Sequence, residues 1–322
     1  MKRISMLIFI LIIFSIHSLV NYYIFIRGWQ GLELYSHLRY YYLGIFIFFF
    51  VAYIAARVLE SFGHSLITEI LNWSGSFWFA AMLYFFLFIL LIDIVRASNH
   101  FLHFLPPGWY LDYAKTKFIL MASVSGFVIL FIVYGFINAS IVRIKTIEMT
   151  VNKTVKNHKQ LNIVLLSDIH LGTIIGPNKL TRIVKKINAL KPDIVLFAGD
   201  VVDENIKPVI KKNLGKLLEN IVSKYGTYAI TGNHEFIGGV GPAVEYLEKH
   251  KVKFLRDTAV LIDSSFWLAG RNDKDMPRFT GKKRMNLEDI LKEVDKTYPL
   301  ILMDHQPFQL SKHQEHLLLL NF

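Results

Sequence analysis

Four long stretches without a charged residue constrain the fold of this chain more than any other feature of its sequence. They are the runs 4–26, 40–56, 70–92 and 118–142, which are 23, 17, 23 and 25 residues long. Each run consists mostly of Ile, Leu, Phe, Val and Tyr, and a helix that crosses a bilayer needs about 20 apolar residues. The sequence therefore predicts an α-helical membrane domain in residues 1–138 with four transmembrane helices. We expect these spans near residues 4–26, 41–59, 75–95 and 118–138.

The amino-acid composition separates this membrane domain from a water-soluble remainder. Hydrophobic residues make up 53% of the chain and charged residues 19%, whereas a soluble domain has about 25% charged residues. Residues 1–138 hold 8 basic and 5 acidic side chains, and residues 139–322 hold 28 and 20. The chain has no Cys, which excludes disulfide scaffolds, thiolate metal sites and cysteine nucleophiles.

Basic residues near the ends of the spans predict the orientation of the membrane domain. With four spans, both chain termini lie on the same side of the membrane. Eight basic residues near the span ends fall on that side and five on the other. Because Lys and Arg accumulate on the cytoplasmic side, we expect a multi-pass protein of the inner or plasma membrane whose C-terminal half is cytoplasmic.

From about residue 160, short apolar runs alternate with helical stretches. Strands are predicted at 161–166, 193–198, 225–230 and 300–303, and helices at 178–190, 208–222 and 242–250. Such alternation predicts βαβ units, and continuous apolar strands are typical of a buried parallel sheet. We expect an α/β domain over 161–322, with central sheets flanked by helices, after a basic connector over 139–160.

Weaker patterns fill the remainder of this half. Three shorter strands at 253–256, 259–262 and 266–269 are expected to form a meander or the edge of a sheet. A helix is expected at 286–294, and Thr146–Val151 favours a short strand within the connector.

Polar side chains follow four of the predicted strands. They are Asp168 and His170, Asp200 and Asp203, Asn233 and His234, and His305. Open α/β sheets place ligand sites at the carboxyl ends of their strands, and D-x-H spacing puts two strand side chains on the same side. Carboxylates, imidazoles and an amide oxygen are ligands for divalent metal ions, and a pair of such ions can clamp a phosphoryl group during its displacement. The sequence therefore predicts a two-metal site.

The order and spacing of these residues resemble a known family. Together they look like the calcineurin-like metallophosphoesterases, and the resemblance covers roughly residues 140–310. The segments that carry it are Asp168–His170 (D-x-H), Gly199–Asp203 (G-D-x-x-D), Gly232–Glu235 (G-N-H-E) and the later His305. The context Leu165–Gly172 is similar to the membrane-associated bacterial branch of the family.

The resemblance implies a metal-dependent phosphoric ester hydrolase that holds two divalent ions, Mn, Fe or Zn, and attacks phosphorus with a metal-activated water. The metal ligands that it implies are Asp168 and His170 for the first ion, Asp200 as a bridge between both, and Asn233 and His305 for the second. His234 would not be a ligand but would face the scissile phosphate, stabilise its charge and donate a proton to the leaving group. Asp203 and Glu235 are not counted as ligands.

The sequence departs from the family pattern at its C-terminal end. The family has a further G-H-x-H motif, with one His for each ion, and the 17 residues after His305 do not contain it. His313 and His316 have a different spacing and lie in the segment 310–320, which is expected to be helical. We therefore expect a truncated catalytic domain that hydrolyses phosphoesters weakly. The alternative is an inactive remnant, or a binding or regulatory membrane protein that keeps the phosphoesterase shape.

The substrate class is left open by the sequence. A phosphomonoester or a phosphodiester fits the implied chemistry, and attachment to the lipid bilayer allows a lipid-linked substrate as well as a soluble one. No nucleic-acid partner is expected, because the only dense basic run is Lys282–Arg284 and such a run is typical of a solvated face or of a contact with anionic lipid.

Overall fold

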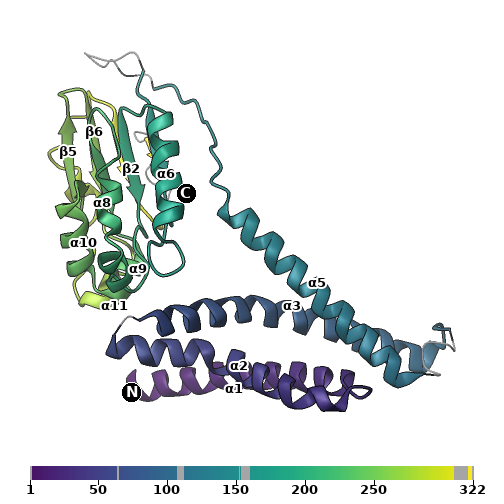
Figure 1. Cartoon of the computed structure of the whole chain (residues 1–322). Helices are drawn as coiled ribbons and strands as arrows, with labels where there is room; N and C mark the ends of the chain where they lie inside the picture. Colours follow the sequence, from purple (N-terminus) through teal and green to yellow (C-terminus); the bar gives the residue numbers. More distant parts are fainter. Residues whose placement is uncertain are drawn as a thin grey trace. The chain divides into compact units, whose positions relative to one another are not determined.

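The structure is a computed structural model that describes residues 2–63, 65–106, 112–151, 153, 160–307 and 318–320. It divides into two compact units, Met1–Ile141 and Val142–Phe322. Figure 1 shows long helices in the first unit and strands with shorter helices in the second.

The N-terminal unit contains four long helices among the residues that the structure describes. They are α1 (Lys2–Gly31), α2 (Arg39–Phe62), α3 (Leu66–Leu102) and α5 (Tyr113–Ser140), and a short 3-10 helix, η1 (Ser36–Leu38), precedes α2. Each is long and apolar enough to cross a membrane, and at most 17% of its most apolar window is buried within the protein. Apolar side chains that are exposed along whole helices need an apolar surrounding, which a bilayer provides.

Small and polar residues bring these helices together. The backbones of α2 and α3 approach closely at Gly75, where a Cβ atom would lie 2.6 Å from the Tyr53 backbone nitrogen. Small residues at helix interfaces are typical of membrane bundles. The buried Asn21 of α1 accepts a hydrogen bond from the Trp78 indole of α3 at 2.9 Å, which joins a third helix to this pair.

The first sheet of the C-terminal unit is wholly parallel. Its strands follow the chain in the order β1 (Ile163–Leu166), β2 (Ile194–Ala198), β3 (Thr227–Ile230) and β4 (Val252–Phe254). Right-handed crossovers between consecutive parallel strands place every connecting helix on the same face. That face carries one hydrophobic core, and the connecting helices are α6 (Pro177–Ala189), α7 (Lys207–Lys211), α8 (Leu214–Leu218), α9 (Asn233–Gly238) and α10 (Val240–Lys249).

The other face of the first sheet packs on a second sheet. This sheet has the order β5 (Thr258–Ile262), β6 (Phe266–Gly270), β7 (Leu300–Met303) and β8 (Leu318–Leu320), with β5 and β6 antiparallel and the other pairs parallel. Ile194 and Leu196 of the first sheet share a core with Leu268 and Ile301 of the second. The outer face of the second sheet is covered at Leu302 by Leu287, and the helices on this side are α11 (Met276–Thr280) and α12 (Leu287–Ile290).

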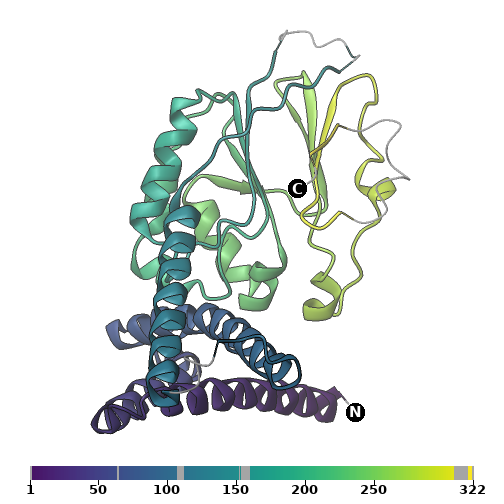
Figure 2. The same cartoon turned by 90° about the vertical axis from the view of Figure 1, so that its right-hand side faces the viewer.

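Figure 2 shows the two sheets next to one another, with helices outside them. The predicted fold class, a helical membrane domain followed by an α/β domain with flanked central sheets, is therefore confirmed. The second sheet is a separate layer. The three shorter strands form no meander: β4 is the edge strand of the first sheet, and β5 and β6 form a hairpin at the edge of the second.

Four expected elements differ from the structure. The stretch 208–222 forms two short helices because Asn213 between them is left-handed, with φ 50°, and the helix expected at 286–294 is limited to Leu287–Ile290. Residues 142–151 form no strand. Leu318–Leu320 is a strand paired with β7 and not a helix, because a short apolar run fits either element and here β7 offers a free edge.

Candidate metal centre

The D-x-H and G-D segments form loops that leave β1 and β2 side by side. Asp168, His170 and Asp200 all have left-handed backbones, with φ of 54°, 51° and 50°. The loops are joined by hydrogen bonds from the His170 N–H to the Asp200 carbonyl (2.9 Å) and from the Asp168 N–H to the Gly199 carbonyl (3.2 Å). Such backbone geometry is uncommon outside glycine and is concentrated at functional sites. The directions of these side chains are therefore set by the loop backbone. They are not set by the alternation of side chains along a strand, as the sequence suggested.

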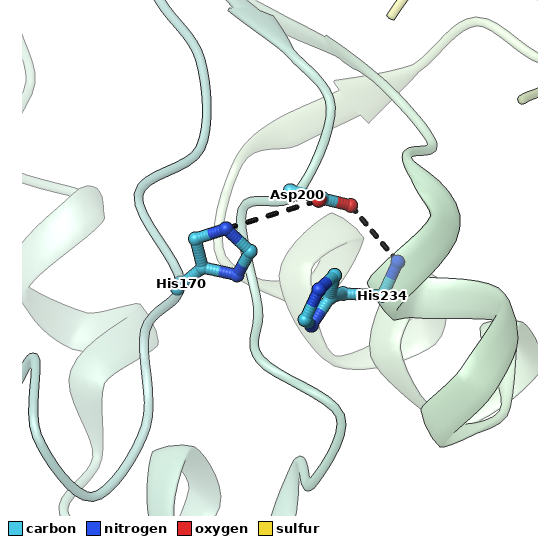
Figure 3. Close-up of side chains that lie close together, drawn as sticks. All are labelled: His170, Asp200 and His234. Atoms are coloured by element: carbon cyan, nitrogen blue, oxygen red, sulfur yellow. Dashed lines mark hydrogen bonds and ion pairs between the residues drawn. The ribbon is translucent and has the colours of Figure 1, made fainter. Parts of the chain in front are cut away.

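The Asp200 carboxylate lies at the centre of the predicted ligands. Its Oδ2 atom is 3.8 Å from His170 Nε2 and 3.3 Å from His305 Nε2. Two sets of side chains have ligand atoms within 4.8 Å of one another, and Asp200 belongs to both: His170, Asp200 and His234 form one, and Asp168, Asp200 and His305 form the other. Figure 3 shows the rings of His170 and His234 next to one another, with Asp200 above and between them.

Close backbone contacts hold Asp200 in place. The His234 N–H donates to Asp200 Oδ1 at 2.9 Å, and a Cβ atom on Gly232 would lie only 2.1 Å from that oxygen. Burial by itself would raise the pKa of Asp200, but hydrogen bonds from His305 and from the His234 backbone outweigh it and lower the pKa. The buried carboxylate is therefore ionised, as a metal ligand must be.

His305 reaches Asp200 from the second sheet, just beyond β7. Its Nδ1 donates to the Ala198 carbonyl at 2.8 Å, which turns Nε2 toward Asp200. A Cβ atom on Gly199 would lie 2.6 Å from the imidazole, so this approach needs glycine. Burial by itself would lower the pKa of His305, but the hydrogen bond to Asp200, the Asp200 charge and the hydrogen bond to the Ala198 carbonyl together outweigh it and raise the pKa.

His234 is held by a carboxylate that is not among the predicted ligands. Its Nδ1 donates to Asp203 Oδ1 at 3.1 Å, and its ring lies 4.4 Å from that of His170, edge to face. Asp203 is also 4.0 Å from His170 Nδ1. Asp203 therefore fixes the orientation of the His234 ring, and the resemblance had implied a supporting or packing role for it.

Asn233 begins α9 and reaches the same edge. Its Oδ1 accepts a hydrogen bond from Gln306 Nε2 at 2.9 Å, and Gln306 directly follows His305. The structure thus places Asn233 next to the segment that carries His305. In this arrangement the Asn233 oxygen is hydrogen-bonded to Gln306. Sequence reasoning missed Gln306, and no signal in the sequence marks it. His313 and His316 lie outside the described residues.

These side chains fit a pair of divalent metal ions. They offer carboxylate oxygens, imidazole nitrogens and one amide oxygen, which suit Mn, Fe and Zn. The two three-residue sets share Asp200, and a shared carboxylate is what two neighbouring ions require. Asp168 is 58% exposed and Asp200 only 3%, so the centre is open toward the Asp168 side.

Glu235 organises the loops beneath this centre without facing it. Its Oε2 accepts from the backbone N–H groups of Gly232 (2.8 Å) and Asp200 (3.2 Å), and its Oε1 accepts from that of Val202 (2.9 Å). Burial raises the pKa of Glu235 to about 7.

Replacing Glu235 with Gln is expected to lower the free energy of unfolding by about 1–3 kcal/mol, because an amide nitrogen cannot accept a hydrogen bond and leaves a buried N–H unpaired. Chemical denaturation of the purified protein measures this change. The control is Glu245→Gln, since Glu245 is 70% exposed and contacts Lys249. An equal effect of the two substitutions would contradict the role of Glu235.

The comparisons with known proteins agree with this geometry. Residues 161–320 match the family described as calcineurin-like phosphoesterase, and the C-terminal unit belongs to that family. The predicted resemblance to this family is confirmed.

Several known proteins are similar to this chain. A Helicobacter pylori protein described as an uncharacterized metallophosphoesterase is 33% identical over 164 residues, which cover 50% of this chain and 42% of that protein. A Campylobacter jejuni protein with the same description is 27% identical over 94% of this chain and 78% of its own length. A Danio rerio protein named transmembrane protein with metallophosphoesterase domain is 32% identical over 54% of this chain and 42% of its own length. The chain thus spans less than half the length of the Helicobacter and Danio proteins that it matches.

Proposed function

We propose that this protein is a membrane-anchored phosphoesterase that uses two divalent metal ions. The observation that carries the proposal is the position of Asp200, whose Oδ2 atom is 3.8 Å from His170 Nε2 and 3.3 Å from His305 Nε2, a proposed ligand of each ion. The ligands proposed are Asp168, His170 and Asp200 for one ion, and Asp200, Asn233 and His305 for the other.

The side chains have separate tasks in this proposal. When bound, the ions activate water for attack on phosphorus and neutralise charge on the phosphoryl oxygens. Asp200 and His305 are buried and fixed by backbone contacts, so they preserve the spacing of the centre. For Asn233 to serve as a ligand, Gln306 must release its Oδ1 atom.

His234 is proposed as the catalytic residue that protonates the leaving group. Its Nδ1 is engaged by Asp203, so its Nε2 is the atom left to face a substrate. Imidazole titrates near neutral pH and can therefore donate a proton under physiological conditions. For this step the imidazole must be doubly protonated, with Nδ1–H donating to Asp203 and Nε2–H facing the leaving group.

The substrate proposed is a phosphomonoester or phosphodiester, and the membrane helices make a lipid-linked phosphoester accessible alongside soluble ones. No nucleic-acid partner is proposed. The test is hydrolysis of an aryl phosphodiester and an aryl phosphomonoester by the full chain with Mn, Fe or Zn. Chelation should abolish turnover and re-addition of metal should restore it. Metal binding without turnover of either ester would favour a binding or regulatory protein instead.

The four apolar helices are proposed to cross the inner or plasma membrane with the C-terminal unit in the cytoplasm. Reporter fusions after residue 141 and in the loop 103–112 are expected to report opposite sides, with the first one cytoplasmic. A fusion in the loop 63–65 should agree with the first. The same side for the first two fusions would contradict four spans, whereas reversed sides would contradict only the orientation.

A further inference from the structure

The helical unit has a half-open pocket between its helices that the phosphoesterase chemistry does not use. It has a volume of about 600 Å³ and lies among all four long helices. Packed proteins contain few voids larger than a water molecule, and this volume falls within the range of ligand-binding pockets. Its walls are largely apolar and include Ile24, Phe46, Trp78, Phe85, Val124 and Val128.

One end of this cavity is charged. Arg27, Asp93, Arg96 and Lys117 all line it. Arg27 and Arg96 lie near the C-terminal ends of α1 and α3, and Lys117 lies near the N-terminal end of α5. Because consecutive helices run in opposite directions, these residues meet at the same end of the bundle.

Positive charge exceeds negative charge at this end by one among these residues, because Lys117 Nζ is paired with Glu33 Oε2 at 2.8 Å and Asp93 is shared by two arginines. Asp93 Oδ2 is 2.5 Å from Arg27 Nη2, and Asp93 Oδ1 is 3.5 Å from Arg96 Nη2. One carboxylate thus serves two guanidinium groups. It also accepts a hydrogen bond from the Tyr23 hydroxyl at 2.6 Å, so its remaining capacity to neutralise them is small. An uncompensated cation beside apolar walls is costly unless an anion pairs with it.

A second, more polar cavity adjoins the first at the same residues. It has a volume of about 500 Å³, and Asp93 and Arg96 line both cavities. Asn99, His100 and His103 form much of its remaining wall. The two cavities therefore offer an apolar compartment and a polar compartment that meet at a cationic junction.

We propose that these cavities bind one anionic phospholipid of the bilayer. Its acyl chain lies between the helices, its phosphate contacts Arg27 and Arg96, with Lys117 nearby, and its headgroup lies against His100 and His103. The planar guanidinium group matches phosphate geometry, and basic pockets between transmembrane helices are suited to anionic headgroups.

This lipid is distinct from any substrate of the phosphoesterase domain. The chain leaves the bundle at Ser140, and Lys117 lies 23 residues earlier on the same helix, a separation of about 35 Å along the axis. If the helices cross the bilayer, the cationic junction faces the leaflet opposite to the one from which the C-terminal unit continues. The site is therefore one for a bound lipid and not an entry to the metal centre.

The test is native mass spectrometry of the full chain after removal of lipid, with phosphatidylglycerol or phosphatidylcholine of identical acyl chains added back. We expect one phosphatidylglycerol to bind per chain, in preference to phosphatidylcholine. The double substitution Arg96→Gln with Lys117→Gln keeps the Arg27–Asp93 pair and should weaken binding about 30-fold, since each basic residue contributes to the attraction. Ala81→Phe, which fills the apolar compartment, should weaken the binding of both phosphatidylglycerol and phosphatidylcholine.

The matched control is Lys115→Gln, which removes the same charge from an exposed position two residues from Lys117. It should leave phosphatidylglycerol binding unchanged. Equal binding of the two lipids to the unaltered chain would overturn the proposal without any variant. Equal weakening by Lys115→Gln and by the double substitution would also overturn it, since binding would then reflect surface charge alone.

Discussion

Replacing Asp200 with Asn is expected to remove bound metal and to lower kcat/KM for a phosphodiester by more than about 100-fold. Loss of a partner that merely supports a metal ligand costs 10–100-fold in metal affinity or activity. Asp200 belongs to both candidate ligand sets, so its loss should affect both ions. The substitution keeps the size of the side chain and removes its negative charge.

Two measurements check this result. Elemental analysis of the purified protein should show fewer than two metal ions per chain, and turnover should recover only partly in excess Mn. Asp289→Asn is the matched control. Asp289 is exposed in α12, and its side chain accepts a hydrogen bond from Asn286, away from the metal centre. Two ions per chain and normal turnover in Asp200→Asn would show that Asp200 does not bridge them.

Replacing His234 with Gln is expected to lower kcat by about 10²–10⁴-fold, the usual contribution of a general acid or base, while the metal content stays unchanged. This prediction separates two roles, because His234 also lies within 4.8 Å of His170 and Asp200 ligand atoms. A loss of metal together with activity would identify His234 as a ligand and contradict its role as proton donor.

The leaving group provides the second measurement. A substrate whose leaving group is a weak base needs little protonation, so His234→Gln should impair an aryl ester less than an alkyl ester. Asp203→Asn should show the same dependence with a smaller loss, about 10–100-fold, because Asp203 acts only by orienting the His234 ring. An equal loss for both esters would exclude proton donation by His234.

Most of the fold was accessible from the sequence because local patterns determine it. The four uncharged runs exceed the length of a membrane span, and the structure has helices at all four. The long helix α6 and the strands β1, β2, β3 and β7 lie within a few residues of their expected bounds. The short helices α7, α8 and α12 and the strand β8 were less predictable. The left-handed backbone of Asn213 divided one expected helix into two. Pairing with β7 made Leu318–Leu320 a strand.

The candidate site divides in the same way. The sequence by itself determined the identity of the chemical groups and their order, since Asp168, His170, Asp200, Asn233 and His305 each follow a strand. Only the tertiary structure decided which groups meet, because His305 belongs to a second sheet and reaches Asp200 across 105 residues of sequence. It also decided the contacts of Asp203 and Gln306, as well as the lipid-sized cavity among the helices. Sequence patterns report burial along one element, whereas these contacts depend on how separate elements pack, which periodicity does not encode.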